Sequence, residues 1–336
     1  MATILIVGSG VVGEANGKGL IKKGHKVVFI DTNHKIVEKL QRQGFTAYLP
    51  SEMDDISDRN FELAMFCVPT PFGEDRNYGS SNNGGPNMSY IKSAIISHGK
   101  RVGGRKKKRK GKDFVGDKFG YHVVVIRSTI QPGTTRNVLL PLLELHSGMK
   151  VGRDIGLCFQ PEFLRTATSE NDFLNPRATI IGEFDKASGD VLKRLYSNLG
   201  KTNRIFRTDI ETAEFAKYVH NSFNATKISF ANEMALVGHR LGVDSNAVLR
   251  MVAVTAEGFW NPYYGIKGGK PYNGKCLPKD IKTFLAFAKK KLKFEMPLLS
   301  AVDSINANIR DKRREEMGFL TARLRSRRKK KIFNDV

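Results

Sequence analysis

The chain is poor in cysteine and tryptophan. Its 336 residues include three cysteines, Cys67, Cys158 and Cys276, and one tryptophan. Three cysteines at these spacings form neither a CxxC metal site nor a disulfide framework, so the sequence favours a reducing compartment and predicts no metal. No apolar run approaches the length of a membrane span, and the N-terminus lacks the basic region and cleavage site of a signal peptide. We therefore expect a cytoplasmic protein without a membrane span.

Acidic residues are scarce relative to basic ones, with 33 Asp/Glu against 56 Lys/Arg and a formal net charge of +23. Residues 100–118 contain ten Lys/Arg and two Asp, and residues 310–331 contain eleven Lys/Arg and three Asp/Glu. Such segments either form solvated surface or bind a polyanion such as nucleic acid, and both interpretations stay open. The run KKKRK at 106–110 is also similar to a nuclear-import signal.

The first two hundred residues alternate short apolar runs with amphipathic ones. Strands are expected at 3–7, 26–30, 63–69 and 121–129, and helices at 15–23, 34–43 and 89–97. This alternation predicts an α/β fold with a Rossmann-like, doubly wound parallel sheet. Residues 99–118 show no apolar periodicity and are predicted to form a mobile loop.

After about residue 205 the pattern becomes helical. Thr208 and Glu211 have the spacing of a capping box, which predicts a helix start followed by a long amphipathic run to Arg240. Two more helices are expected at 280–292 and 298–314. The sequence therefore predicts an α/β domain followed by an all-helical one.

A glycine motif lies between the first expected strand and helix. Gly8, Gly10 and Gly13 have GxGxxG spacing, and the next strand ends at Asp31. In this context the glycines allow a tight turn, close approach of a pyrophosphate and close helix packing, while the helix N-terminus donates N–H groups. The Asp31 carboxylate can accept hydrogen bonds from the ribose hydroxyls. No arginine follows Asp31 closely, and this favours NAD over NADP. The alternative is a glycine-rich turn with a solvated aspartate.

The stretch YNGKCLPKD (272–280) places a cysteine near an expected helix start. An isolated cysteine is usually a small buried hydrophobe. Pro278, however, suits the first turn of a helix, so Cys276 is expected at the helix N-terminus, a position that favours the thiolate. Asp280 follows one turn later, and Gly274 would let a substrate approach the backbone. The stretch therefore predicts a nucleophile.

Lys217 and Asn221 are spaced i, i+4 and share one helical face. A cation beside an amide donor could stabilise an oxyanion. The alternative is a solvated stripe on an amphipathic helix.

Together these stretches resemble the UDP-glucose/GDP-mannose dehydrogenase family. The matching segments are VGSGVVG (7–13), CVPTP (67–71), IRSTIQPGTT (126–135), PEFL (161–164), DFLNPRATIIG (172–182), residues 211–233 and YNGKCLPKD (272–280). They follow the family's order over roughly residues 1–310. The resemblance implies an NAD-dependent oxidoreductase of nucleotide-sugar metabolism and polysaccharide biosynthesis. It would act on a CH–OH donor, oxidising the C6 hydroxymethyl of a nucleotide sugar, UDP-glucose first, to a carboxylate in two hydride transfers.

The resemblance also implies residue roles. The catalytic set is Cys276, Lys217, Asn221, Asp280, Glu162 and Thr129. The cysteine would form a thiohemiacetal and then a thioester. The lysine and asparagine would hold the oxyanion. Asp280 with Thr129 would position water, and Glu162 would transfer protons. The cofactor set is Gly8, Gly10, Val11, Val12, Gly13, Asp31, Lys35, Pro69, Thr70 and Thr129. The substrate set is Glu162, Phe163, Leu164, Arg165, Lys217, Asn221 and Gly274.

We divide the chain accordingly into three parts. Residues 1–204 form an NAD-binding domain with a basic insert at about 99–118, residues 205–310 a helical central and catalytic domain that forms a homodimer, and residues 311–336 a basic tail. The family's C-terminal domain, which binds the nucleotide, is expected to be missing. Two positions also depart from the family pattern: Thr166 stands where many members have a second glutamate, and no arginine occurs between 251 and 275.

The alternative function is a dehydrogenase-fold protein with little or no catalytic activity. It would use the basic segments at 100–118 and 310–331 to bind nucleic acid in a larger assembly. The cysteine, lysine, asparagine and aspartate favour the enzyme, whereas the localised charge favours this alternative.

Overall fold

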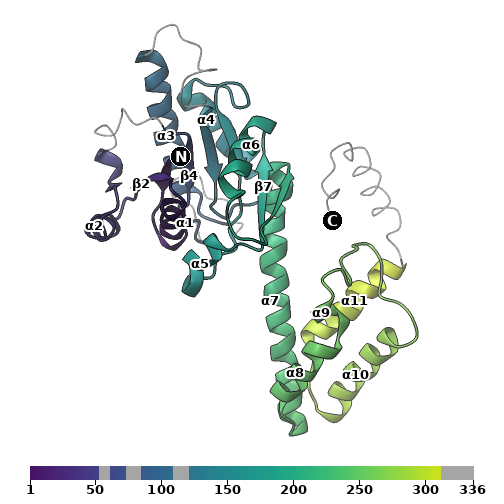
Figure 1. Ribbon diagram of the computed structural model, residues 1–336. Helices are drawn as coiled ribbons and strands as arrows, with labels where there is room; N and C mark the ends of the chain where they lie inside the picture. The colour runs from purple at the N-terminus through teal and green to yellow at the C-terminus, as the bar shows by residue number, and fades with distance from the viewer. Residues whose placement is uncertain (53–60, 73–84, 109–120, 312–336) are drawn as a thin grey trace. The chain divides into compact units, whose positions relative to one another are not determined.

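The computed structural model describes residues 1–52, 61–72, 85–108 and 121–311 (Figure 1). The chain divides into two compact units, of which the first comprises residues 1–219 and the second begins at residue 220. The predicted basic segments reach beyond the described residues at 109–118 and 312–331, as do the end of the expected helix at 298–314 and part of the nuclear-import-like run.

The first unit is built on one eight-stranded sheet. Its strands are β1 (Thr3–Val7), β2 (Lys26–Ile30), β3 (Ala47–Tyr48), β4 (Leu63–Phe66), β5 (Val123–Ile126), β6 (Gly156–Phe159), β7 (Ala178–Glu183) and β8 (Arg204–Thr208). Their order is β3-β2-β1-β4-β5-β6-β7-β8, and every neighbouring pair is parallel except β6 and β7. The predicted doubly wound, mainly parallel sheet is therefore confirmed, with β7 and β8 running against the other six strands.

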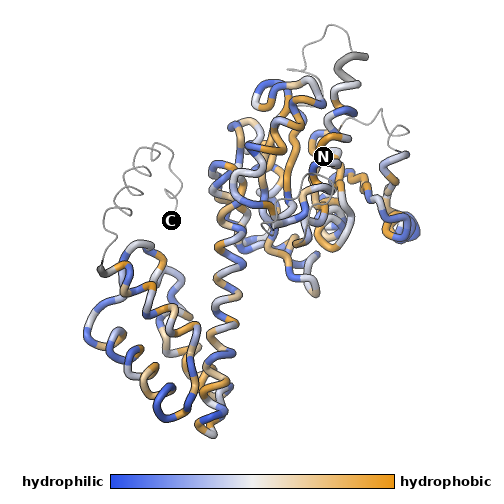
Figure 2. The backbone as a smooth tube through the Cα atoms, turned by 180° about the vertical axis from the view of Figure 1, so that it is seen from behind, coloured by the Kyte–Doolittle hydropathy of each residue, from blue (hydrophilic) through white to orange (hydrophobic). Residues whose placement is uncertain are grey.

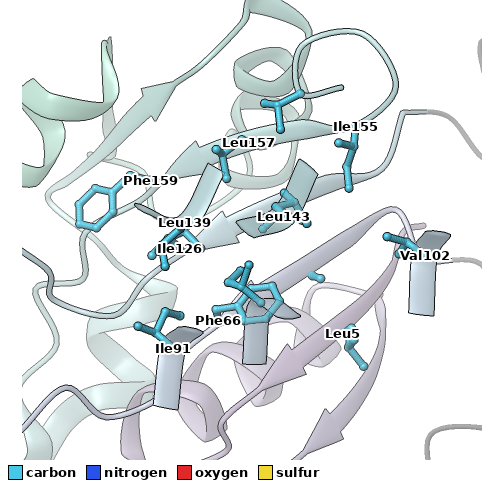
Figure 3. Packing of buried hydrophobic residues seen from close by; sticks show 14 of the residues in the cluster. Leu5, Phe66, Ile91, Val102, Ile126, Leu139, Leu143, Ile155, Leu157 and Phe159 are labelled. Carbon is cyan, nitrogen blue, oxygen red and sulfur yellow. The ribbon is translucent and has the colours of Figure 1, made fainter. Parts of the chain in front are cut away.

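Helices cover both faces of this sheet. They are α1 (Val11–Lys22), α2 (His34–Arg42), α3 (Ser89–Lys108), α4 (Leu140–Ser147), α5 (Ser169–Leu174) and α6 (Lys186–Tyr196), with short turns of helix at Thr135–Leu139 and Thr166–Thr168. Successive strand residues point to opposite faces. Phe66 and Ile126 accordingly pack with Ile91 of α3 on one face (Figure 3), whereas Met65 and Val125 pack on the face that α1, α5 and α6 cover.

The helix α3 corrects the predicted loop at 99–118. Residues 99–108 continue the helix that begins at Ser89. Val102 is buried in the core, and a Cβ on Gly103 would lie 2.5 Å from the carbonyl oxygen of Ser147 at the end of α4. The glycines that suggested a loop therefore permit close packing of two helices, and this packing outweighs their low helix propensity. Residues 109–118 lie outside the described part.

Helix α7 (Ile210–Leu241) begins differently from the prediction. Thr208 ends β8, so it does not cap the helix. Asp209 does so instead, because its carboxylate accepts the backbone N–H of Thr212 at 2.8 Å. The predicted capping box is therefore wrong by one residue, and the long helix itself is confirmed.

The second unit is helical. Besides the rest of α7 it contains α8 (Ser245–Thr255), α9 (Glu257–Trp260), α10 (Leu277–Lys291) and α11 (Pro297–Asp311). Its buried apolar cluster is small: Val237, Ala288, Met296 and Leu299. The strands of the first unit form continuous hydrophobic stretches, whereas α7 alternates between hydrophobic and hydrophilic residues (Figure 2). On α8, Val248, Met251 and Val254 repeat every three residues and are exposed.

Candidate active site

A cavity of about 1380 Å³ opens at the carboxyl ends of the parallel strands of the first unit. It lies where β1 and β4 are neighbours although their helices cover opposite faces, which is the point where doubly wound sheets bind ligands. Eight of the predicted cofactor residues line it: Gly8, Gly10, Val11, Val12, Asp31, Pro69, Thr70 and Thr129. Their direct contact with NAD stays a prediction.

The glycine turn has the geometry that a dinucleotide requires. Gly8 has φ +85°, which disfavours other residues, and a Cβ on Gly13 would lie 2.0 Å from the Gly8 carbonyl oxygen. Gly10 caps α1, and a Cβ there would meet no atom within 4 Å. The space above the free N–H groups of α1 is therefore open for an anionic group such as a pyrophosphate.

Asp31 is held in place beside this turn. Its Oδ2 accepts from the Ser9 N–H at 2.7 Å and its Oδ1 from the Asn33 N–H at 2.8 Å. A carboxylate oxygen can accept more than one hydrogen bond, so capacity remains for ribose hydroxyls. Lys35, which we also predicted to bind the cofactor, is exposed and does not line the cavity; its N–H donates to Asn33 in the cap of α2.

The loops after β4 and β5 are tied to each other. Thr70 Oγ1 donates to the Thr129 carbonyl oxygen at 2.7 Å, and Ser128 Oγ donates to the Val68 carbonyl oxygen at 2.7 Å. Both threonines thereby become part of one wall of the cavity. The structure brings them together although 59 residues separate them.

Glu162, which lines the cavity, forms a partly buried pair with Lys217. Lys217 Nζ donates to Glu162 Oε1 at 2.9 Å and to the Glu162 carbonyl oxygen at 2.6 Å, and it lies 5.4 Å from the centre of the Phe163 ring. Burial alone would raise the pKa of Glu162, but the Lys217 ammonium and the Leu164 N–H outweigh burial and lower it. The pair therefore consists of a carboxylate and an ammonium at neutral pH.

Arg165 is fixed on the surface next to this pair. Its guanidinium donates to both carboxylate oxygens of Asp172, at 3.0 and 2.7 Å, and these bonds hold the pKa of Asp172 well below its usual range. The sequence did not single out Asp172. It restrains the segment 162–165 that we predicted to contact the substrate.

Cys276, Asn221 and Asp280 belong to the second unit. Cys276 is exposed and is the N-cap of α10, as predicted, and the Asp280 N–H donates to its carbonyl oxygen at 2.8 Å. Asn221 is exposed on α7, and Gly274 has φ +90° before α10. Joint action of these residues with Glu162 and Lys217 on one substrate stays a prediction.

Comparison with known proteins identifies the family of the chain. The NAD binding domain of the UDP-glucose/GDP-mannose dehydrogenase family matches residues 51–200, and the central domain of this family matches residues 211–308. GDP-mannose 6-dehydrogenase of Pseudomonas savastanoi pv. phaseolicola is 35% identical over 322 residues, which cover 91% of this chain and 68% of the relative. The chain belongs to the UDP-glucose/GDP-mannose dehydrogenase family.

Solved structures of the family agree with the fold. A crystal structure of a ternary complex of GDP-mannose dehydrogenase from Pseudomonas aeruginosa has a TM-score of 0.76 at 30% identity, covering 91% of this chain and 68% of the other. A UDP-glucose dehydrogenase from the archaeon Pyrobaculum islandicum has a TM-score of 0.63 at 26% identity, with 92% and 68% covered. The resemblance inferred from the motifs, the Rossmann-like fold and the NAD cofactor are thereby confirmed.

As a family member, the chain is an oxidoreductase whose cofactor site fits NAD in its glycine turn and acidic residue. Among the described residues, no helix is long and apolar enough to cross a membrane, and no three His, Cys, Asp or Glu side chains cluster as metal ligands would. Thr166, at the position of the family's frequent second glutamate, begins a single turn of helix after Arg165. Glu162 is thus the carboxylate that this segment contributes to the cavity.

Proposed function

We propose that this chain is an NAD-dependent nucleotide-sugar 6-dehydrogenase that oxidises a C6 hydroxymethyl group to a carboxylate in two steps. The observation that carries this proposal is the cavity that joins a dinucleotide cradle to Glu162, the carboxylate paired with Lys217. When bound, NAD accepts the hydride in each oxidation. The side chains of the protein then have to move protons, hold the substrate oxygen and retain the aldehyde.

The residues suit these tasks. Glu162, held as a carboxylate, can accept the proton of the hydroxyl group as the first hydride leaves C6. Cys276 thiolate then adds to the aldehyde carbon, and Lys217 and Asn221 donate to the resulting oxyanion. Loss of the second hydride leaves a thioester on Cys276. Water held by Asp280 and Thr129 attacks it, so that the carboxylate leaves and the thiol is restored.

The relatives guide the choice of substrate. Pseudomonas relatives named GDP-mannose 6-dehydrogenase are 32–35% identical to this chain, whereas the UDP-glucose 6-dehydrogenase of Haloferax volcanii is 28% identical over 321 residues. We therefore propose a nucleoside-diphosphate hexose and rank GDP-mannose before UDP-glucose, the substrate predicted from the sequence. NADH formation with the two sugars side by side decides between them.

The cysteine mechanism is tested in the same assay with Cys276→Ser. The wild type should form two NADH per sugar consumed, and the variant at most one, because the serine hydroxyl is a poor nucleophile toward the aldehyde and the carboxylate product should not form. A variant that still forms two NADH per sugar would rule out the thioester. Circular dichroism of the variant confirms that the fold is retained.

We propose a homodimer through the second unit. Val248, Met251 and Val254 form an exposed apolar face on α8, and Phe223 and Ile228 of α7 are also exposed. Side chains of this size on a helix normally pack against a partner, and the resemblance to the family implies a second copy. Sedimentation velocity tests this proposal, and a monomer at all concentrations would contradict it.

No observation on the described residues supports the alternative function, nucleic-acid binding. Residues 100–108 form the end of α3, and the remaining basic residues of both segments, apart from Arg310, lie outside the described part. Polyanion binding therefore stays a prediction from composition.

A further inference from the structure

Arg127 is a buried cation in the wall of the cofactor cavity. It directly follows β5, is 3% exposed, and lines the cavity. Its Nη1 donates to the Tyr196 hydroxyl at 2.9 Å, and that hydroxyl donates to Gln160 Oε1 at 2.8 Å. Its Nε is buried without a hydrogen-bond partner, and the guanidinium forms no ion pair with a carboxylate of the described residues. Buried charges are normally paired, so this arginine requires an explanation.

The neighbours of Arg127 leave one positive charge uncompensated. Burial raises the pKa of the Cys67 thiol to about 11 and also raises the pKa of Tyr196, so both groups are neutral at pH 7. Glu162 is the carboxylate that interacts with the guanidinium through space, and it is already bonded to Lys217. Two buried cations, Arg127 and Lys217, therefore share one partly buried anion, Glu162.

The strand order places this excess charge near one end of the cofactor. Asp31 follows β2, the glycine turn follows β1, Arg127 follows β5 and Glu162 comes after β6. Neighbouring strands lie about 4.8 Å apart, so the cavity extends along a row of strand ends. Because Asp31 suits the adenosine ribose and the turn suits the pyrophosphate, the nicotinamide half belongs toward Arg127 and Glu162.

We propose that Arg127 makes this cavity bind the reduced cofactor in preference to the oxidised one. The inference rests on the proposed function, which assigns NAD to this cavity. The nicotinamide ring is positively charged when oxidised and uncharged when reduced, so a buried cation repels the oxidised form only. Arg127 lines the cavity, and its charge acts on the ring through its electric field. The bias favours sugar oxidation, in which a hydride moves to the ring.

The test is the ratio of the dissociation constants of NAD⁺ and NADH, measured by fluorescence and competition on the full chain without sugar. Arg127→Gln should lower this ratio about tenfold, which corresponds to unit charges roughly 12 Å apart at an effective dielectric constant of about 20. Arg127→Lys keeps the charge and should keep the ratio. Tyr196→Phe removes a hydrogen bond without removing charge and should also keep it. Equal changes of both constants in Arg127→Gln would show a structural role and overturn the proposal.

Glu162→Gln shifts the charge in the opposite direction. It removes the one nearby anion, so the ratio should rise, again by about tenfold. If Arg127→Gln does not fold, this variant decides: a ratio that stays constant or falls overturns the proposal. If the ratios change as expected but no sugar is oxidised, the proposed function is contradicted and this inference is not. The two outcomes can be told apart because neither binding measurement requires a sugar.

Discussion

Removing either partner of the partly buried Glu162–Lys217 pair should lower the stability of the first unit by more than the loss of one hydrogen bond would. The two side chains are 15% and 7% exposed, and their charged groups are 2.9 Å apart. Removing one partner of a buried pair costs about 3–5 kcal/mol, because the other charge stays buried without compensation. We expect Lys217→Met to lower the free energy of unfolding by about 3 kcal/mol. Glu162→Gln should cost about 2 kcal/mol, since Lys217 keeps its bond to the Glu162 carbonyl oxygen.

The double variant should lose less stability than the sum of the single variants, with a coupling of about 2 kcal/mol. Urea unfolding followed by circular dichroism measures this in the four proteins. Trp260, the one tryptophan of the chain, lies in the second unit, so its fluorescence transition is the internal control and should not move. Additive single effects, within roughly 0.5 kcal/mol, would refute the reasoning.

The same pair predicts that its contribution to the stability of the protein is lost as the pH falls. Burial raises the pKa of Glu162, but the Lys217 ammonium, the Leu164 N–H and the Arg127 charge together outweigh burial and lower it from its ordinary value of 4.5. A carboxyl group whose folded pKa lies below its unfolded pKa contributes stability above the unfolded value and loses it as the pH falls through the folded one. The stability difference between wild type and double variant should therefore be constant above about pH 5 and narrow below 4.5.

Two pairs of glycine substitutions provide further predictions. Gly13→Ala should weaken NAD binding and lower the stability of the protein, because its Cβ would lie 2.0 Å from the Gly8 carbonyl oxygen. Gly10→Ala should weaken NAD binding alone. Calorimetry with NAD measures the binding, and thermal unfolding measures the stability. In α3, Gly103→Ala should destabilise by about 1–3 kcal/mol, since its Cβ would lie 2.5 Å from a carbonyl oxygen of α4. Gly104→Ala meets no atom within 4 Å and should stabilise the helix by about 0.5–1 kcal/mol; stabilisation by both changes would contradict the packing of α3 on α4.

The sequence predicted the strands β1, β2, β4 and β5 and a parallel sheet, but neither the other four strands nor every helix boundary. Strands buried on both faces must be apolar throughout, so runs such as 63–66 and 123–126 are visible without tertiary information. The extension of α3 to Lys108 depends on contacts of Val102 and Gly103 with residues about forty positions away, which local periodicity does not contain. The start of α7 at Ile210 depended on two adjacent residues that can both cap a helix.

Part of the candidate site was likewise predictable from the sequence, and part was not. The glycine turn and Asp31 are close in sequence and were recognisable by spacing. Glu162 and Lys217 are 55 residues apart, and resemblance to the family placed both in the catalytic set without predicting their contact. Arg127 was missed, although a signal existed: a charged residue directly follows four buried strand residues, where a further apolar residue or a turn residue would be ordinary.

The three cysteines differ so strongly in environment that a thiol reagent should distinguish them. Cys158 lies in the sheet core with a pKa raised by burial, and the Cys67 thiol stays protonated for the same reason. Cys276 alone of the three is exposed. An alkylating reagent should therefore add one equivalent to the folded chain, and the site could carry a single spectroscopic label without removal of any other cysteine.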